Sequence, residues 1–154
     1  MSDLYDVVGV GFGPSNLALA IALTEHNAQV GPGERVRGRF LERQPRFGWH
    51  RGMLIEDATM QVSFLKDLVT MRNPSSGFSF LCYLRDRGRL VDFINHKNLF
   101  PLRTEFHDYF EWAAAQVEDL VTYGTNVTDL GFDGSCLRVG GHRARNVMLA
   151  TGLR

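Results

Sequence analysis

The sequence has few cysteines, no excess of either charge and no long hydrophobic run. Cys82 and Cys136 lie far apart and outside any metal-ligand spacing, which argues against a disulfide scaffold or a zinc site and suits a reducing cytoplasm. Lys plus Arg and Asp plus Glu each total 17, so the basic excess typical of nucleic-acid or membrane-surface modules is missing. The apolar run 17–23 is far shorter than the roughly 20 residues that span a bilayer. The first residues carry no basic stretch, so we expect no secretory signal and a cytoplasmic protein.

The remaining pattern predicts an α/β fold in one domain, residues 1–154, because strand-like and helix-like segments alternate at the start of the chain. A β-branched run at 5–10 predicts a buried parallel strand, and the apolar run 17–23 predicts a buried helix. Residues 27–38, rich in glycine and charge, predict a loop, and 39–41 a second short strand.

The middle of the chain predicts helices, and its last part predicts strands. Thr104 is expected to cap the clearest helix, whose apolar residues recur at three- and four-residue spacing. Asp133-Gly134 and Gly140-Gly141 predict hairpin turns of a small β-meander. The expected helices are 63–71, 79–87, 90–96 and 105–117, and the expected strands are 121–123, 127–132, 136–139 and 147–150.

A glycine-rich turn is the candidate ligand-binding motif of the sequence. Gly11-x-Gly13-x-x-Asn16 follows a predicted strand and opens a predicted helix, as in a dinucleotide-binding fingerprint. There, Gly11 permits the tight turn, Gly13 lets a pyrophosphate approach the backbone, and the helix N-terminus offers free N–H groups. Glu42, which ends the second predicted strand, would accept a ribose hydroxyl. The alternatives are a tight turn without a ligand and a solvated charge at a strand end.

Longer stretches of the sequence resemble the ornithine/lysine N-hydroxylases, which are flavin-dependent, NADPH-using monooxygenases of siderophore biosynthesis. The resemblance covers nearly the whole chain, and an Asn at the third fingerprint position is normal for this family. The matching stretches are Gly9-Val-Gly-Phe-Gly-Pro-Ser-Asn-Leu17, Phe47-Gly-Trp-His50, Met60-Gln-Val-Ser-Phe-Leu-Lys-Asp-Leu68 with Arg72-Asn73-Pro74, Phe78-Ser-Phe-Leu81, Pro101-Leu-Arg, Phe106-x-x-Tyr109, Trp112 and Ala150-Thr-Gly152.

The resemblance implies a role for further residues. It places Pro14 and Ser15 in the FAD-binding turn. It implies that Trp49, His50 and Gln61 contact the flavin, that the backbone of Val127 contacts the adenine, and that Lys66 holds the carboxylate of the substrate. Without the resemblance, Trp49 is a core residue, Gln61 a loop amide, Lys66 a surface lysine and Val127 an ordinary strand residue. No catalytic side chain is assigned, and the histidines show no metal-ligand spacing to one another.

The family implies a Rossmann-like FAD-binding fold and the hydroxylation of the side-chain amine of L-ornithine or L-lysine with NADPH and molecular oxygen. Its members are about three times longer and carry a second glycine-rich fingerprint for NADPH. We therefore expect this chain to be the N-terminal FAD-binding portion, with the NADPH domain absent. The alternatives are a non-catalytic FAD- or nucleotide-binding fragment and, less well supported, an NAD(P)-dependent dehydrogenase. The substrate choice and a homo-oligomeric state stay open.

Overall fold

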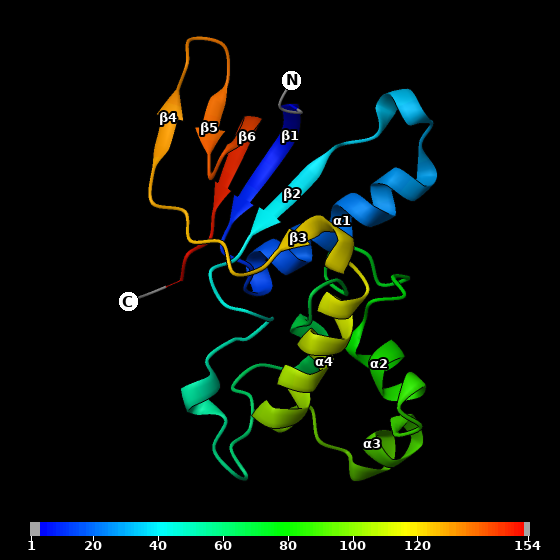
Figure 1. Ribbon diagram of the computed structural model, residues 1–154. Helices are drawn as coiled ribbons and strands as arrows, with labels where there is room; N and C mark the ends of the chain where they lie inside the picture. Colours follow the sequence, from blue (N-terminus) through cyan, green and yellow to red (C-terminus); the bar gives the residue numbers. More distant parts are fainter. Residues whose placement is uncertain (1–3, 153–154) are drawn as a thin grey trace. The chain divides into compact units, whose positions relative to one another are not determined.

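The computed structural model describes residues 4–152, which divide into two compact units. We call Met1–Phe47 with Val117–Arg154 the sheet unit, and Gly48–Gln116 the helical unit. Figure 1 shows the strands in the sheet unit, together with the helix nearest the N-terminus, and the other α-helices in the helical unit.

The sheet unit is built on one six-stranded sheet with the order β3-β2-β1-β6-β5-β4. Strands β3, β2, β1 and β6 are parallel, whereas β5 and β4 are antiparallel to their neighbours. Val8 and Val10 of the central strand are buried with Leu41, as expected for a strand inside a parallel sheet. This arrangement confirms the α/β prediction. The bounds are β1 Leu4–Val10, β2 Gly38–Leu41, β3 Val121–Thr122, β4 Leu130–Phe132, β5 Leu137–Val139 and β6 His142–Leu149.

The last strands differ in extent from their predictions. β3 pairs with β2 at the opposite edge of the sheet, so it is not part of the meander. β4 covers less than the predicted 127–132, and β6 covers more than the predicted 147–150. β6 is long because β5 pairs with its first residues while β1 pairs with it along nearly its whole length. The meander β4-β5-β6 therefore ends in the strand that rejoins the parallel sheet. Both predicted turns are present, with positive φ at Gly140 and Gly141.

Helix α1, Pro14–Gln29, follows the glycine turn directly and is longer at both ends than the predicted 17–23. Its buried face includes Leu17, Ala20 and Ile21, while other apolar positions are only partly buried. The predicted loop 27–38 is correspondingly shorter. Asn27 closes it, because its amide donates to the Val36 carbonyl and accepts from the Val36 N–H, both at 2.8 Å.

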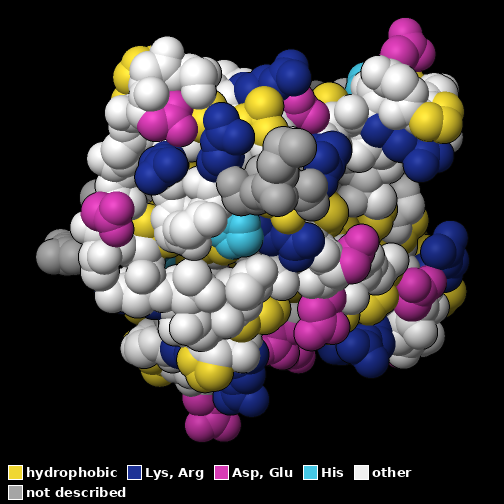
Figure 2. Space-filling model, turned by 45° about the horizontal axis from the view of Figure 1, so that its top comes forward, with side chains coloured by type: hydrophobic (Ala, Val, Ile, Leu, Met, Phe, Trp, Pro, Cys, Tyr) yellow, Lys and Arg dark blue, Asp and Glu magenta, His cyan; other side chains and the backbone are white. Residues whose placement is uncertain are grey.

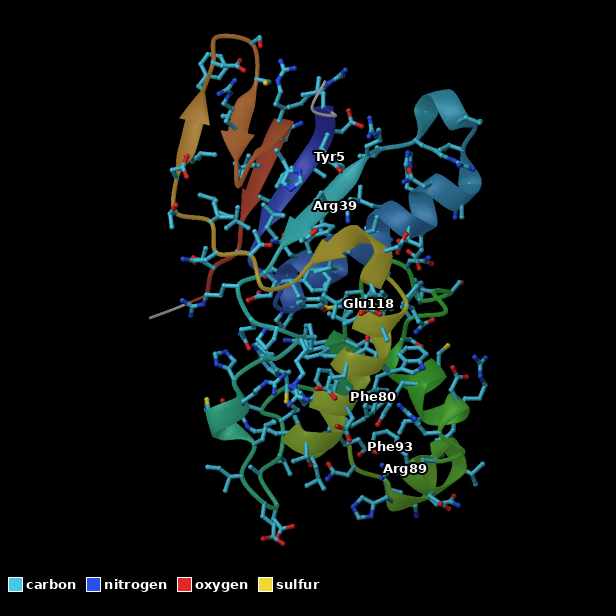
Figure 3. The ribbon with its side chains drawn as sticks, viewed as in Figure 1. Tyr5, Arg39, Phe80, Arg89, Phe93 and Glu118 are labelled. Atoms are coloured by element: carbon cyan, nitrogen blue, oxygen red, sulfur yellow. The ribbon has the colours of Figure 1, made fainter. Side chains whose placement is uncertain are left out.

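The helical unit contains α2 (Phe80–Asp86), α3 (Leu90–His96) and α4 (Arg103–Ala115), within two residues of the predicted helices. The predicted Thr104 cap is wrong, because Leu102 is the N-cap and Thr104 lies in the first turn. Phe80 is at the centre of the aromatic core. Its ring meets Phe93 of α3 edge-on, with centroids 5.4 Å apart. Both residues are labelled in Figure 3. The buried face of α4 supplies Phe106, Tyr109, Phe110 and Ala113, as its periodicity predicted.

Residues 63–71 do not form the predicted helix. Only a 3₁₀ turn, Phe64–Lys66, is present. The side chain of Asp67 accepts hydrogen bonds from the amides of Val69 and Thr70, at 3.0 and 2.7 Å, and from the amide of Phe80, at 2.8 Å. A short carboxylate that takes up nearby amides in this way competes with the carbonyls of a helix, so the helix does not continue.

The surface carries charges of both signs. Figure 2 shows Lys and Arg side chains interspersed with Asp and Glu over the face it presents, in keeping with the formal net charge of zero. Among the helices of residues 4–152, none is long and apolar enough to cross a membrane.

Candidate functional site

The glycine turn leaves the carboxyl end of β1, and Gly11 makes it possible. Gly11 has φ +86°, a conformation that side chains disfavour, and a Cβ there would collide with the carbonyl oxygen of Ala150. Its N–H donates to the Leu41 carbonyl at 2.9 Å, which ties the turn to the end of β2. Only glycine tolerates both the positive φ and the close approach of the Ala150 carbonyl at this position.

The N-terminus of α1 is open to a ligand. Gly13 is the N-cap, and the first helical hydrogen bond runs from the Leu17 N–H to the Gly13 carbonyl at 2.9 Å. No side chain caps this end, and the first turn has no acidic residue. The amides of Ser15 and Asn16 precede the first helical bond, so they have no partner within the helix. A Cβ placed on Gly13 would meet no atom within 4 Å. Pro14, at the first helical position, has no N–H to lose.

Asn16 is fully buried beneath this turn. Its Nδ2 donates to the carbonyl of Gly11 at 2.7 Å and, more weakly, to that of Val10 at 3.5 Å. Its Oδ1 is buried and has no hydrogen-bond partner among the described residues. The side chain thus fixes the inner side of the turn at the cost of one unpaired acceptor.

Glu42 is buried and not a solvated charge at a strand end, since its relative exposure is 7%. One carboxylate oxygen accepts from the Phe12 N–H at 2.7 Å and the other from the Gln44 N–H at 2.8 Å. Because each carboxylate oxygen has two lone pairs, both can accept a further hydrogen bond. Glu42 is therefore held in place beside the turn and can still receive a hydroxyl donor.

Val127 does not lie in a strand, although 127–132 was predicted as one. It belongs to the irregular segment between β3 and β4, and its half-buried side chain packs against the core of Val8, Val10 and Leu41. A Cβ on Gly140 would come within 3.1 Å of its Cγ2. Because Val127 lies outside the strands, its main chain is not part of the sheet ladder.

Trp49 and His50 belong to the helical unit. The ring of Trp49 meets those of Phe110 and His50 edge-on, with centroids 5.1 and 4.9 Å apart. Trp49 is half-buried, so it is partly a core residue, and its main-chain N–H donates to Nε2 of His107 at 3.5 Å. His50 is exposed and has φ +45°, which is uncommon for a residue with a side chain.

Gln61 and Lys66 are both exposed on the helical unit. The chain just before Gln61 is fixed by the Met60 N–H, which donates to the Pro101 carbonyl at 2.8 Å. Lys66 ends the 3₁₀ turn, and its N–H donates to the carbonyl of Ser63 at 2.9 Å. A well-anchored backbone therefore presents two side chains that are available to ligands.

Three groups on α4 have metal-ligating atoms close together, namely His107, Asp108 and Glu111. Their i, i+4 His–Glu relation was missed in the sequence, where only histidines were compared with one another. Nε2 of His107 accepts the Trp49 N–H, so we place the ring proton on Nδ1, which lies 3.8 Å from Glu111. A protonated nitrogen that faces a carboxylate suits an electrostatic contact and not a metal ligand.

Phe12 is the site residue that the sequence reasoning missed. Its contribution is a main-chain N–H, so the identity of its side chain gives no signal of it. Its buried ring packs against Phe40 and edge-on against Tyr123, with centroids 5.4 and 6.2 Å away. Burial, followed by the charges of Glu118 and Glu42, raises the pKa of Tyr123 to about 12, so its phenol stays neutral beside Phe12.

The structure brings six of the predicted residues together in the sheet unit, while Val127 occupies the same unit further along the chain. Trp49, His50, Gln61 and Lys66 belong to the helical unit. The six are Gly11, Gly13, Pro14, Ser15, Asn16 and Glu42.

Comparison with known proteins agrees with the family resemblance of the sequence. The family described as L-lysine 6-monooxygenase/L-ornithine 5-monooxygenase matches residues 3–154. An L-ornithine N(5)-monooxygenase of Burkholderia cepacia is 54% identical over 124 residues, which cover 80% of this chain and 27% of that protein.

Solved structures agree with this match. The ornithine hydroxylase PvdA from Pseudomonas aeruginosa has a TM-score of 0.88 and 38% identity, over 97% of this chain and 39% of that one. The ornithine N-hydroxylase KtzI from Kutzneria sp. 744, with reduced FAD, NADP⁺ and L-ornithine, has a TM-score of 0.85 and 45% identity, over 98% of this chain and 38% of that one. This chain spans about a quarter of the length of the curated relatives that it matches.

Proposed function

Because this chain belongs to the L-lysine 6-monooxygenase/L-ornithine 5-monooxygenase family, we propose that it is the FAD-binding part of an N-hydroxylating monooxygenase. One observation carries the proposal. The uncapped N-terminus of α1 lies beside Gly13, whose missing side chain leaves open space. Free amides and the positive end of a helix dipole attract a pyrophosphate, and a bare glycine lets it come close.

The residues that are present fit FAD. The amides of Ser15 and Asn16 would bind its pyrophosphate, with no acidic residue in the first turn to repel it. Glu42 would accept the hydroxyls of the adenosine ribose, since the Phe12 and Gln44 amides already fix its two oxygens. The main chain of Val127, which is not used by the sheet, would contact the adenine.

The helical unit would supply the remaining contacts. By resemblance, Trp49, His50 and Gln61 would lie against the flavin, and Lys66 would bind the substrate carboxylate. Lys66 suits this role because an exposed ammonium on an anchored backbone acts as a point charge for a carboxylate. No side chain of the described residues is assigned as a catalytic acid or base.

Bound FAD would supply the redox chemistry, in which two electrons from NADPH and two protons reduce one atom of molecular oxygen to water while the other forms the N–O bond. The protein binds and orients the amino acid, so that its side-chain amine and not its α-amino group is hydroxylated. Lys66 achieves this by fixing the carboxylate end, at a distance from the amine that reacts.

L-Ornithine is the favoured substrate, with L-lysine as the second candidate. Curated relatives at 54, 52 and 50% identity are named for L-ornithine, whereas a solved L-lysine 6-monooxygenase from Pseudomonas syringae is 32% identical. We place the reaction in siderophore biosynthesis and in the cytoplasm, where the two free cysteines would stay reduced.

Titration of the purified chain with FAD, followed by quenching of flavin fluorescence, tests the proposal. We expect saturable binding of one FAD per chain, and a chain that does not bind FAD would overturn the proposal. Anaerobic addition of NADPH then tests whether this chain can reduce its bound flavin by itself. Since residues 17–154 contain no second Gly-x-Gly-x-x-Gly, we expect the flavin to stay oxidised, whereas rapid bleaching would reveal an NADPH site in this chain.

A further inference from the structure

The third position of the dinucleotide fingerprint is occupied by a buried Asn16 and not by glycine. In the general motif, the third glycine lets the helix pack closely against the strand. Here the strand supplies the space instead. A Cβ on Gly9 of β1 would collide with the ring of Phe40 and would lie 2.8 Å from Nδ2 of Asn16. The absence of a side chain at Gly9 therefore leaves room for both the ring of Phe40 and the side chain of Asn16.

The side chain of Asn16 contacts the turn from the inside. Its Nδ2 donates to the carbonyls of Gly11 and Val10, at 2.7 and 3.5 Å. The reverse orientation of the amide would place Oδ1 against the Gly11 carbonyl, two acceptors in contact, so the assignment of the two atoms is fixed. In this orientation Oδ1 is buried without a partner among the described residues.

An unpaired buried acceptor carries a free-energy cost that packing alone does not explain. An apolar side chain of similar size would fill the same space without that cost. The cost is explained if Nδ2, the donor of the same side-chain amide, is needed to hold the conformation of the turn. The Val10 carbonyl is already held by the Ala150 N–H at 2.9 Å, so the carbonyl that depends on Nδ2 is that of Gly11. With this carbonyl drawn inward, the N–H groups of the turn are left to face an anion.

We propose that Asn16 is a positioning residue for the dinucleotide, which holds the carbonyl of Gly11 away from the pyrophosphate. This inference rests on the proposed function. Asn16 acts through the turn and forms no side-chain contact with the ligand. It therefore determines FAD affinity more strongly than it determines folding stability.

Asn16→Ala removes this contact, and Asn27→Ala is the matched control. Asn27 lies on the same helix and also bridges main-chain groups, but its donor and acceptor are both used by Val36, far along the chain from the turn. We expect Asn16→Ala to raise the dissociation constant for FAD at least tenfold, with faster amide hydrogen exchange at residues 10–13. We expect Asn27→Ala to lower the melting temperature more and to change FAD affinity less than twofold.

Asn16→Asp keeps the shape of the side chain and suits the first turn of a helix, so it tests the same point if Asn16→Ala folds poorly. An oxygen would then face the Gly11 carbonyl, and we expect weaker FAD binding in a folded protein. FAD affinity within twofold of the parent for a folded Asn16 variant would overturn the inference and leave the proposed function intact. The inference would also be overturned if, in both Asn16→Ala and Asn27→Ala, FAD affinity fell in the same proportion to the loss of folding stability. A parent chain that binds no FAD would overturn both.

Discussion

The N–H of Phe12 donates to the carboxylate of Glu42 at 2.7 Å, across 30 residues of sequence. This bond joins the glycine turn to the residue that follows β2, and the Gln44 N–H holds the second oxygen at 2.8 Å. The group that we propose to bind the ribose is thereby fixed to the proposed phosphate-binding turn before any ligand arrives. Such preorganisation reduces the ordering that binding would otherwise require.

Glu42→Gln tests this relationship. The amide NH₂ of glutamine would face one of the two main-chain donors, so one hydrogen bond to a charged group is lost and a donor is left unpaired. We expect the free energy of unfolding to fall by about 1.5–3 kcal/mol and FAD affinity to fall as well. Urea unfolding and FAD titration measure the two effects. Glu34→Gln, at an exposed position, should change neither by much.

Gly13→Val tests the proposed pyrophosphate site at the N-terminus of α1 directly. A Cβ at Gly13 meets no protein atom within 4 Å, so the variant should fold with nearly the parent melting temperature. Its branched side chain would occupy the space of the pyrophosphate, and FAD binding should be lost. Gly31→Val is the control, because Gly31 also precedes a proline at the N-cap of a helical turn and has open space around it. A Gly13→Val chain that binds FAD as tightly as the parent would contradict the site assignment.

Local patterns predicted the strand and the helix on either side of the glycine turn well. The strand, the glycine turn and the helix follow one another in the chain, and their residue types depend on backbone geometry at each position. The bond between Phe12 and Glu42 could not be predicted in this way, because a main-chain donor leaves no trace in the sequence. The acidic residue was identified only by its place after a strand.

Predictions were wrong where distant groups decide the conformation. Asp67 accepts the amide of Phe80 as well as two nearby amides, and the helix expected over 63–71 does not form. β6 begins at His142, five residues before its predicted start, because pairing on both edges stabilises polar residues in a strand. Val127 belongs to the predicted strand 127–132 but lies before the observed β4, where it packs over the core beside Gly140. None of these contacts follows from the spacing of apolar residues.

Tyr109→Phe should destabilise the helical unit. The buried hydroxyl of Tyr109 donates to the Phe78 carbonyl at 2.8 Å and accepts from the Leu68 N–H at 3.2 Å. Its removal leaves both main-chain groups without this partner, and we expect a loss of about 1–3 kcal/mol of unfolding free energy. Tyr5→Phe in the sheet unit is the control, and a Tyr109→Phe protein as stable as the parent would show that these bonds contribute nothing.

The same substitution should change the alkaline stability. Burial, with a smaller contribution from the charge of Asp67, raises the pKa of Tyr109 far above its usual value of 10. The stability that the neutral phenol contributes is complete below pH 10, the range of the unfolded pKa, and is lost as the pH rises toward the folded pKa. From pH 9 to 11, the unfolding free energy of the parent should fall more steeply than that of Tyr109→Phe. Parallel slopes in urea unfolding would contradict the assignment.

Lys66→Gln tests the substrate contact, in a chimeric enzyme where this chain replaces the matching N-terminal part of the Pseudomonas aeruginosa L-ornithine N(5)-monooxygenase. Lys66 is exposed, so its replacement should leave folding and FAD binding unchanged. Loss of a charge-assisted hydrogen bond of roughly 1.5–3 kcal/mol should raise KM for L-ornithine about 10- to 150-fold. The rate of flavin reduction by NADPH should change little, since Lys66 is assigned to the carboxylate and not to the cofactor.

Lys97→Gln is the matched control for Lys66→Gln, because Lys97 is the other lysine of the chain and is also exposed. It should leave KM within twofold of the parent value, which separates a local contact from a general loss of positive charge. Raising the ionic strength should weaken L-ornithine binding to the parent more than to Lys66→Gln, because only the parent has the charge pair that salt screens. If Lys66→Gln kept the parent KM but no longer bound FAD, the lysine would serve the cofactor, and the carboxylate of the substrate would need another partner.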